Sequence, residues 1–318
     1  MTWVTWRQYR YQGALAAALL AALAVLLLIS GLHAAQVWHS ALAGCRKDNS
    51  CGNLSLSNPA FTTLVAATSA VPLLAGLFWG APMVAHELET GTNQFAWTQS
   101  ITRRRWLAVR AGWLLLAAAV LAAAVSALVT WWIGPDHALS ADAFKVNRFD
   151  ITDIAPVGYA IFAMALGICT GALLRRTLPA LAVTLAGFAG IRELFALWLR
   201  LHYMTPVTVY YKLTAPFVPA GSYLSVSQGI VGPNGQPPVG TGNNYVFNGE
   251  PIPAVCQTAV QHPASIAPCM AAQGYRGYLT YQPASRFWAF QGIETCIFVV
   301  LAAVLLGVTF WVLKRRDA

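Results

Sequence analysis

The chain has 318 residues, of which 57% are hydrophobic and 10% charged, with a net charge of +9. An ordinary soluble domain carries about 25% charged residues, so this chain has too few charges to cover a soluble surface. The composition excludes intrinsic disorder and, with only six cysteines, a secreted disulfide scaffold. It indicates an integral membrane protein.

Six apolar stretches are long enough to cross a bilayer, which takes about 20 residues. Because backbone groups in lipid must be paired internally, each stretch is predicted to be a helix. The predicted spans cover residues 13–35, 61–85, 107–133, 154–174, 178–199 and 287–313. The first is too long for the apolar region of a typical signal peptide, so we expect it to be retained.

The segment 2–11, before the first span, combines aromatic and basic residues. The rings of Trp3, Trp6, Tyr9 and Tyr11 suit the level of the lipid headgroups. We expect a short interfacial helix here, and a frayed N-terminus is the alternative.

Lysine and arginine placement predicts that both termini lie on the inner side of the membrane. With that orientation the inner segments hold ten positive residues in 41, and the two shorter outer loops hold four in 45. Basic clusters beside spans set orientation, so the net charge does not indicate a nucleic-acid partner. We predict an all-α membrane fold with six transmembrane helices, N-in/C-in, preceded by the interfacial helix.

The outer segment 200–286 differs from the rest because it holds 11 of the 17 prolines. Its turn signals predict loops, yet tyrosine, valine and isoleucine are too frequent for disorder. We expect a loop-rich outer cap. The predicted domains are residues 1–199 (interfacial helix and the first five transmembrane helices), 200–286 (extracellular cap) and 287–318 (last transmembrane helix and cytosolic tail).

Four cysteines fall in predicted outer segments, as two pairs that are close in sequence. Disulfides persist on the oxidising side of a membrane. We therefore predict the disulfides Cys45–Cys51 and Cys256–Cys269, with four free thiols as the alternative.

No motif of a soluble enzyme occurs in the sequence: there is no phosphate-binding loop, dinucleotide fingerprint, HExxH or nucleophile elbow. The six histidines are scattered without metal-ligand spacing, so we expect no metal site. The soluble enzyme classes that these motifs mark are therefore not indicated.

The inner loop between the second and third spans has the most informative pattern. Glu87 and Glu89 lie at its start, and Gly91 permits a sharp turn. Three consecutive arginines, 103 to 105, stand at the N-terminal end of the third span, where the helix dipole disfavours positive charge. Helix stability does not explain them, so either membrane orientation or a partner does.

The stretch Glu87-Leu88-Glu89-Thr90-Gly91-Thr92, followed by Ser100-Ile101-Thr102-Arg103, resembles the ExExGT…R signature of ABC-2-type transporter permeases. Residues 281–294 look like the start of the last helix in actinobacterial members. The order of interfacial helix, six spans and large outer segment is also similar to that family. The outer segment is longer and richer in Pro and Gly than in its better-known members.

The resemblance implies the membrane-spanning permease subunit of an ATP-driven exporter in a bacterial cell membrane, which is a transport subunit and not itself an enzyme. In that family the motif leads into a coupling helix that docks on a separate ATPase subunit. The ATPase subunit would hold ATP and magnesium, and this chain would hold no cofactor. The other implied partners are membrane lipid and a second permease subunit, in a homodimer or a heterodimer. The implied ATPase-coupling residues are Glu87, Glu89, Gly91, Thr92, Arg103, Arg104 and Arg105.

Arg192, Glu193 and Glu294 are charged residues inside predicted spans. A charge in lipid is costly and is usually paired or functional. Because Arg192 and Glu294 fall at a similar depth, we predict an ion pair that joins the fifth span to the sixth, with a substrate or gating role as the alternative. Glu193, one residue on, must face another direction.

Two other functions remain open. One is a membrane sensor or assembly subunit that binds a ligand through the outer cap. The other is an intramembrane enzyme, for which Cys169 and Cys296 are candidate nucleophiles, although no histidine lies mid-span to serve them. Apolar walls favour a lipid-like or amphipathic substrate, but those walls also face lipid, so the substrate stays open.

Overall fold

The computed structural model describes residues 18, 21–32, 36, 59–90, 103–137, 143–238, 246–247 and 249–315. The chain forms two compact units. The helical unit comprises Met1–Leu139, Lys145–Arg200 and Trp288–Ala318, and the sheet unit comprises Ser140–Phe144 and Leu201–Phe287. The predicted interfacial helix and the predicted Cys45–Cys51 disulfide lie outside the described residues.

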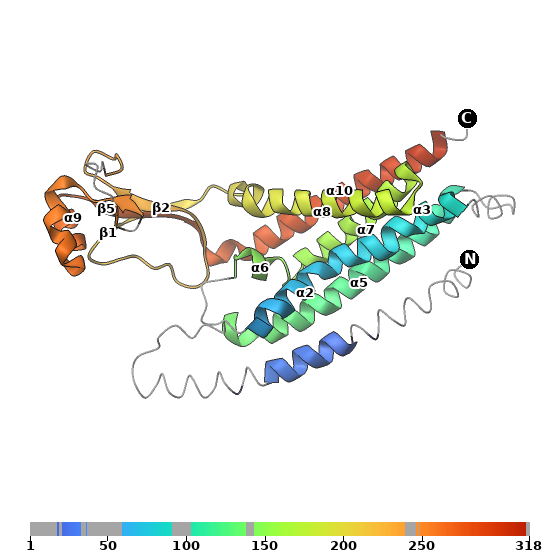
Figure 1. Cartoon of the computed structure of the whole chain (residues 1–318), viewed down its shortest axis with the longest axis horizontal. Helices are drawn as coiled ribbons and strands as arrows, with labels where there is room; N and C mark the ends of the chain where they lie inside the picture. The colour runs from blue at the N-terminus through green and yellow to red at the C-terminus, as the bar shows by residue number, and fades with distance from the viewer. Residues whose placement is uncertain are drawn as a thin grey trace. The chain divides into compact units, whose positions relative to one another are not determined.

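Long helices lie side by side in the helical unit (Figure 1). They are α2 (Pro59–Ala75), the π-helix η1 (Gly76–Gly80), α3 (Ala81–Thr90), α5 (Arg103–His137), α7 (Ala155–Leu174), α8 (Thr177–Leu197) and α10 (Phe287–Arg315), with the short α6 (Val146–Phe149) and η2 (Leu199–His202).

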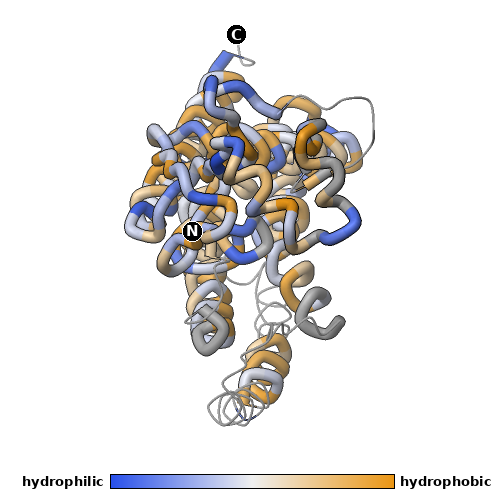
Figure 2. Tube along the Cα trace, turned by 90° about the vertical axis from the view of Figure 1, so that its left-hand side faces the viewer, coloured by the Kyte–Doolittle hydropathy of each residue, from blue (hydrophilic) through white to orange (hydrophobic). Residues whose placement is uncertain are grey.

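Five helical segments in the described part of the chain are long and apolar enough to cross a membrane. They are Thr63–Glu87, Arg105–Ile133, Ala155–Leu174, Thr177–His202 and Ala284–Arg315. Orange, apolar residues recur among white and blue ones along the tube in Figure 2. The chain is therefore a mostly helical, multi-pass membrane protein. The predicted first span is described only in part, by the apolar helix Ala21–Leu32, so six spans and N-in/C-in orientation stay predictions.

Helix α7 forms the centre of the helical unit. In its most apolar stretch of 18 residues, 78% is buried, against 22% in the corresponding stretches of α8 and α10. A helix that is apolar on all sides belongs in an interior. Met164 and Ile168 of α7 share one buried cluster with Leu107 of α5 and Val84 of α3.

Glycines bring α7 into backbone contact with the segment that joins α2 to α3. A Cβ atom added at Gly167 would lie 2.4 Å from the Gly76 carbonyl oxygen, and one at Gly171 would lie 2.5 Å from that of Ala81. Small residues allow this close approach between membrane helices. The π-helix ends at Gly80, two residues before Pro82, which has no N–H to donate to the carbonyl four residues earlier. The Ala81 N–H donates to the Gly76 carbonyl oxygen, five residues back.

Replacing Gly167 with alanine is expected to destabilise the protein by about 1–3 kcal/mol, because the new methyl group meets rigid backbone atoms. The measurement is thermal unfolding of the purified chain in detergent. Gly307→Ala is the matched control, since no atom lies within 4 Å of a Cβ added there. Equal unfolding temperatures for the two variants would contradict this packing.

The sheet unit contains a three-stranded antiparallel sheet in the order β1 (Val207–Lys212), β5 (Arg276–Gln282), β2 (Leu224–Val231). A two-stranded hairpin, β3 (Val246–Phe247) and β4 (Glu250–Pro251), follows β2. The remaining elements are η3 (Ala254–Gln261), η4 (Pro263–Ser265), α9 (Ile266–Ala272) and η5 (Ala284–Arg286).

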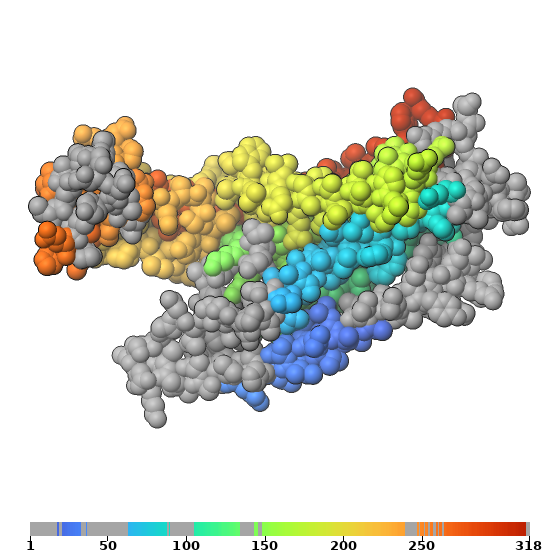
Figure 3. Space-filling view, in the orientation of Figure 1, coloured from blue at the N-terminus to red at the C-terminus, as the bar shows by residue number. Residues whose placement is uncertain are grey.

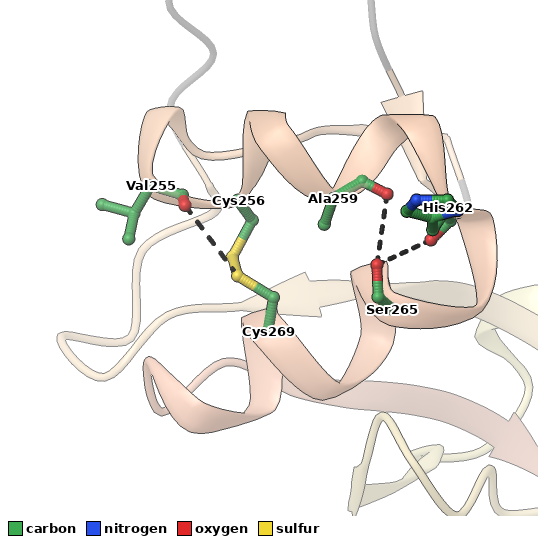
Figure 4. The surroundings of a disulfide bond; sticks show 6 residues. All are labelled: Val255, Cys256, Ala259, His262, Ser265 and Cys269. Atoms are coloured by element: carbon green, nitrogen blue, oxygen red, sulfur yellow. Dashed lines mark hydrogen bonds between the residues drawn. A yellow bond between two sulfur atoms is a disulfide. The ribbon is translucent and has the colours of Figure 1, made fainter.

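The predicted disulfide Cys256–Cys269 is present and joins η3 to α9 (Figure 4). Cys256 and Met270 are fully buried, in a cluster that also contains Ile230 of β2. The Ser265 hydroxyl donates to the carbonyl oxygens of His262 and Ala259, which ties the start of α9 to η3.

The sequence predicts a loop-rich cap in an all-α fold, whereas the structure contains β-sheets in this segment. Prolines between the strands supply the turn signals, whereas within the strands more exposed and less exposed residues alternate. Tyr, Val and Thr in β1 and β5 favour extended structure, and β5 alternates buried and partly exposed residues over much of its length.

Candidate functional site

The segment 87–92 is called the inner motif, after its predicted side of the membrane. Its two acidic residues contact different helices of the same chain. The carboxylate of Glu87, in α3, accepts a hydrogen bond from the Arg110 guanidinium of α5. Both side chains are mostly buried, at 19% and 10% exposure, and the guanidinium also lies 5.0 Å from the centre of the Trp106 ring. Glu87 therefore joins α3 to the first turns of α5.

Glu89 caps the start of α8. Its Oε2 accepts hydrogen bonds from the Thr177 hydroxyl at 2.7 Å and from the Thr177 backbone N–H at 3.1 Å. A carboxylate at a helix N-terminus pairs with free N–H groups and with the positive end of the helix dipole. The two carboxylates thus point to different helices, as expected for residues two apart.

The bonds from Thr177, with the hydroxyl first, hold the pKa of Glu89 below its ordinary value. The unfolded chain therefore binds this proton at a higher pH than the folded chain does. The stabilisation is present above the ordinary glutamate pKa of about 4.3 and is lost as pH falls through the lower folded pKa. We expect Glu89→Gln to lower the unfolding temperature slightly near neutral pH and to match wild type in strong acid; a gap independent of pH would contradict the assignment.

The other coupling residues are only partly described. Arg105 is exposed on α5. Arg103 and Arg104 lie in the first turn of α5, with side chains outside the described residues, as are Gly91 and Thr92.

A second group of polar side chains lies at the opposite end of α7, and we call it the charge network. It consists of Asp150 after α6, Tyr159 of α7, Arg192 of α8, Arg200 of η2 and Glu294 of α10. The side chains of Asp150, Arg200 and Glu294 are at most 2% exposed. Burial this deep requires each charge to be paired.

Arg200 is the centre of the charge network. Its Nε and Nη2 donate to the two carboxylate oxygens of Glu294 at 3.0 and 2.8 Å, a bidentate pair. Nη2 also lies 2.5 Å from Asp150 Oδ1, and the guanidinium lies 4.1 Å from the centre of the Phe149 ring. The Tyr159 hydroxyl lies 2.5 Å from Glu294 Oε1 and 3.2 Å from Asp150 Oδ1.

Arg192 completes the charge network from α8. Its Nη2 lies 2.9 Å from Asp150 Oδ2, and its Nη1 donates to the carbonyl of Ser69 in α2 at 3.2 Å. The guanidinium lies 4.7 Å from the centre of the Tyr159 ring. With two carboxylates and two guanidiniums ionised, the charge network is neutral and joins α2, α7, α8, η2 and α10.

The charge network corrects the predicted pairing. We expected Arg192 to pair with Glu294, but in the structure Glu294 pairs with Arg200 and Arg192 pairs with Asp150. Both predicted residues do lie in one buried cluster. Glu193 is exposed on α8, in a different direction from Arg192, as the helical spacing requires.

Sequence reasoning missed Asp150 and Arg200, because it placed them in outer loops next to the spans. Their opposite signs, within a few residues of neighbouring span ends, were the available signal. Counting boundary charges together with the charges inside the spans would have added Asp150 and Arg200 to the possible partners of Arg192 and Glu294.

Helix α8 presents a surface that the described residues leave uncovered, and Figure 3 shows the helix in yellow-green on the face in view. Ala182, Ala186 and Gly190 repeat every four residues on that exposed side, and Glu193 follows them. A Cβ at Gly190 would meet no atom within 4 Å. Small residues at this spacing are typical of contacts between membrane helices, and an intramembrane acid faces protein or water rather than lipid.

The family model described as "ABC-2 membrane transporter related" matches residues 17–200, more than half of the chain. The matched range includes the inner motif and, of the charge network, all but Glu294. No curated protein and no solved structure matches the chain.

Proposed function

The chain belongs to the ABC-2 membrane transporter related family, and from this premise we propose that it is the permease subunit of an ATP-driven exporter. The observation that carries the proposal is the match of the family model to the multi-span helical unit, which contains the inner motif. No phosphate-binding loop occurs in the printed sequence, so we assign ATP and magnesium to a separate ATPase subunit.

The contacts of the inner motif support a coupling role. A force applied to the segment that follows α3 reaches α5 through Glu87 and Arg110, and reaches α8 through Glu89 and Thr177. Movement at one end of the bundle is thus delivered to two spanning helices at once. Residues 91–102, which would form the coupling segment, follow directly after these two acids.

The uncovered surface of α8 supports a second permease subunit in the assembly. Its small residues allow close helix contact, and Glu193 requires a polar or aqueous neighbour in the membrane. We assign this surface to the interface with that subunit, along which the transport pathway runs.

A photoreactive amino acid placed at Ala186 is expected to cross-link to a second permease chain in native membranes. The matched control is Leu116 of α5, which is 55% exposed and should mark lipid instead. The mass of the adduct separates a homodimer from a heterodimer. Equal protein cross-linking from the two positions would contradict the assignment of α8.

The direct test of the function is isolation of the tagged chain from its own membranes in a mild detergent. The proposal requires a stoichiometric ATP-hydrolysing subunit and vanadate-sensitive hydrolysis in the eluate. A chain that elutes as a pure oligomer from membranes containing that ATPase would contradict it.

The folded, disulfide-tied sheet unit favours a second candidate, a membrane sensor or assembly subunit that binds a ligand through this unit. The two functions differ in one measurement. Transport requires ATP-dependent movement of a compound across vesicles that contain the complex, whereas sensing requires ligand binding without net movement.

A further inference from the structure

One face of the three-stranded sheet carries an ordered ladder of side chains, which we call the ladder face. Cross-strand neighbours of β1 and β5 pair as Thr208 with Thr280, Tyr210 with Tyr278, and Lys212 with Arg276. Residues two apart on a strand share a face, so these six side chains lie together. The ladder face therefore has a hydroxyl row, an aromatic row and a cationic row.

The first two rows are internally satisfied. The Thr208 and Thr280 hydroxyls share a hydrogen bond of 2.9 Å, and the rings of Tyr210 and Tyr278 lie 6.4 Å apart. Tyr210 is nevertheless 62% exposed. An aromatic pair of this kind offers contact area to a partner at low entropic cost.

The cationic row is not satisfied. Lys212 and Arg276 are directly opposite each other and both are exposed, and like charges in this position destabilise a sheet. In the part of the chain that the structure describes, neither side chain forms an ion pair. Glu250 approaches Tyr278 from the β2 side, over Gly229, without pairing with either cation. The row is complementary to an added acidic group.

The outer edge of β1 is the place where that group can be supplied. In the described part of the sheet unit β1 pairs with β5 alone, so no strand covers its other edge. At the end of β1 the Lys212 carbonyl accepts the Ala215 N–H at 2.9 Å. A strand added there would repeat the row spacing of about 6.7 Å, because residues two apart in any strand are separated by that distance.

We propose that the open edge of β1 binds an extended acidic peptide of a partner protein as a fourth strand. The peptide carries an acidic residue opposite Lys212, an apolar or aromatic residue opposite Tyr210 and a hydroxyl residue opposite Thr208. A second copy of this chain fits less well, since symmetric pairing of two β1 strands about Tyr210 places Lys212 opposite Thr208 and adds no acid to the cationic row.

The binding experiment uses the full chain in detergent and fluorescent nine-residue peptides with the pattern Glu-x-Phe-x-Thr in both chain directions. Saturable binding is expected for one direction. Replacing the peptide's Glu with Lys should weaken binding about tenfold, because two exposed ion pairs are lost and replaced by repulsion. Lys212→Gln combined with Arg276→Gln should weaken it by about threefold to tenfold. Lys314→Gln, an exposed charge at the end of α10, is the control and should change nothing.

Backbone pairing is tested with two N-methylated versions of the peptide. Methyl groups on alternate residues in one phase block the N–H groups that face β1, and in the other phase they do not. Binding should be lost with one phase and kept with the other. Equal binding by the two phases, or equal binding of the Glu and Lys peptides, would overturn the proposal.

Light scattering with wild type and Tyr210→Ala tests the alternative occupant. A dimer that is lost in Tyr210→Ala, without peptide binding to wild type, would assign the edge to a second copy and would overturn the peptide assignment. All of these measurements are made without ATP, so their failure leaves the proposed permease function standing.

Discussion

Replacing Glu294 with alanine is expected to remove most of the folded protein. Its carboxylate accepts hydrogen bonds from Arg200 and from the Tyr159 hydroxyl, and it is 1% exposed. Without it, two arginines face Asp150 alone, which leaves one uncompensated buried charge. Removing one partner of a buried pair costs about 3–5 kcal/mol, a large share of the roughly 5–15 kcal/mol that typically separates folded from unfolded. The measurement is the fraction recovered as a single size-exclusion peak in detergent.

Two further variants separate the charge network from a general sensitivity to charge. Lys314→Ala removes a charge from an exposed position at the end of α10 and should leave recovery unchanged. Arg200→Met combined with Glu294→Leu removes one charge of each sign and leaves Arg192 paired with Asp150 at 2.9 Å, so recovery should be partly restored. Strictly additive losses in this double-mutant cycle would count against the direct Arg200–Glu294 pair.

Changing Glu87 and Glu89 together to Gln is expected to abolish ATP-driven function while leaving the chain in the membrane. Acidic residues contribute little to topology, so insertion should be normal. The double change removes the charge that holds Arg110 and the charged cap of α8. We expect ATPase recovery from the isolated complex to fall about tenfold, because α3 is no longer tied by charge to α5 and α8 directly before the proposed coupling segment.

Arg110→Gln shows whether Glu87 acts within the chain or on the partner. This change breaks the Glu87–Arg110 pair but keeps both carboxylates. If Glu87 works by joining α3 to α5, Arg110→Gln weakens coupling as much as Glu87→Gln does. If Glu87 contacts the ATPase, only Glu87→Gln weakens it. Full ATPase recovery and unchanged transport in the double-Gln variant would return this loop to a plain connector.

Long apolar runs made the spanning helices predictable. The predicted span 154–174 corresponds to α7, Ala155–Leu174. Pro156 suits the first turn of a helix, and Arg175 ends α7 in a left-handed conformation with φ of 54°. The apolar run and Pro156 are local signals that remain readable when the neighbours in space are unknown, whereas an arginine does not signal a left-handed helix end.

The partners within the charge network were not predictable in the same way. Arg200 and Asp150 are 50 residues apart, and Glu294 lies 94 residues beyond Arg200. Depth along a helix can be counted from a sequence, but the direction in which neighbouring helices present their side chains cannot. The sheet was missed for a related reason, since β1 and β5 are separated by more than 60 residues and pair only through the fold.

The most direct test of the central claim is whether ATP hydrolysis on a separate subunit changes the surroundings of α8 in this chain. A cysteine replaces Glu193 in a Cys296→Ser background, Cys169 being buried, and its labelling by a membrane-impermeant maleimide is followed in the complex isolated from native membranes. We predict that labelling rates differ severalfold between the nucleotide-free complex and the complex trapped with ATP and vanadate, and that Glu87→Gln with Glu89→Gln removes the difference. Identical labelling in the two states, in a complex shown to contain the ATPase subunit and to hydrolyse ATP, would contradict the account.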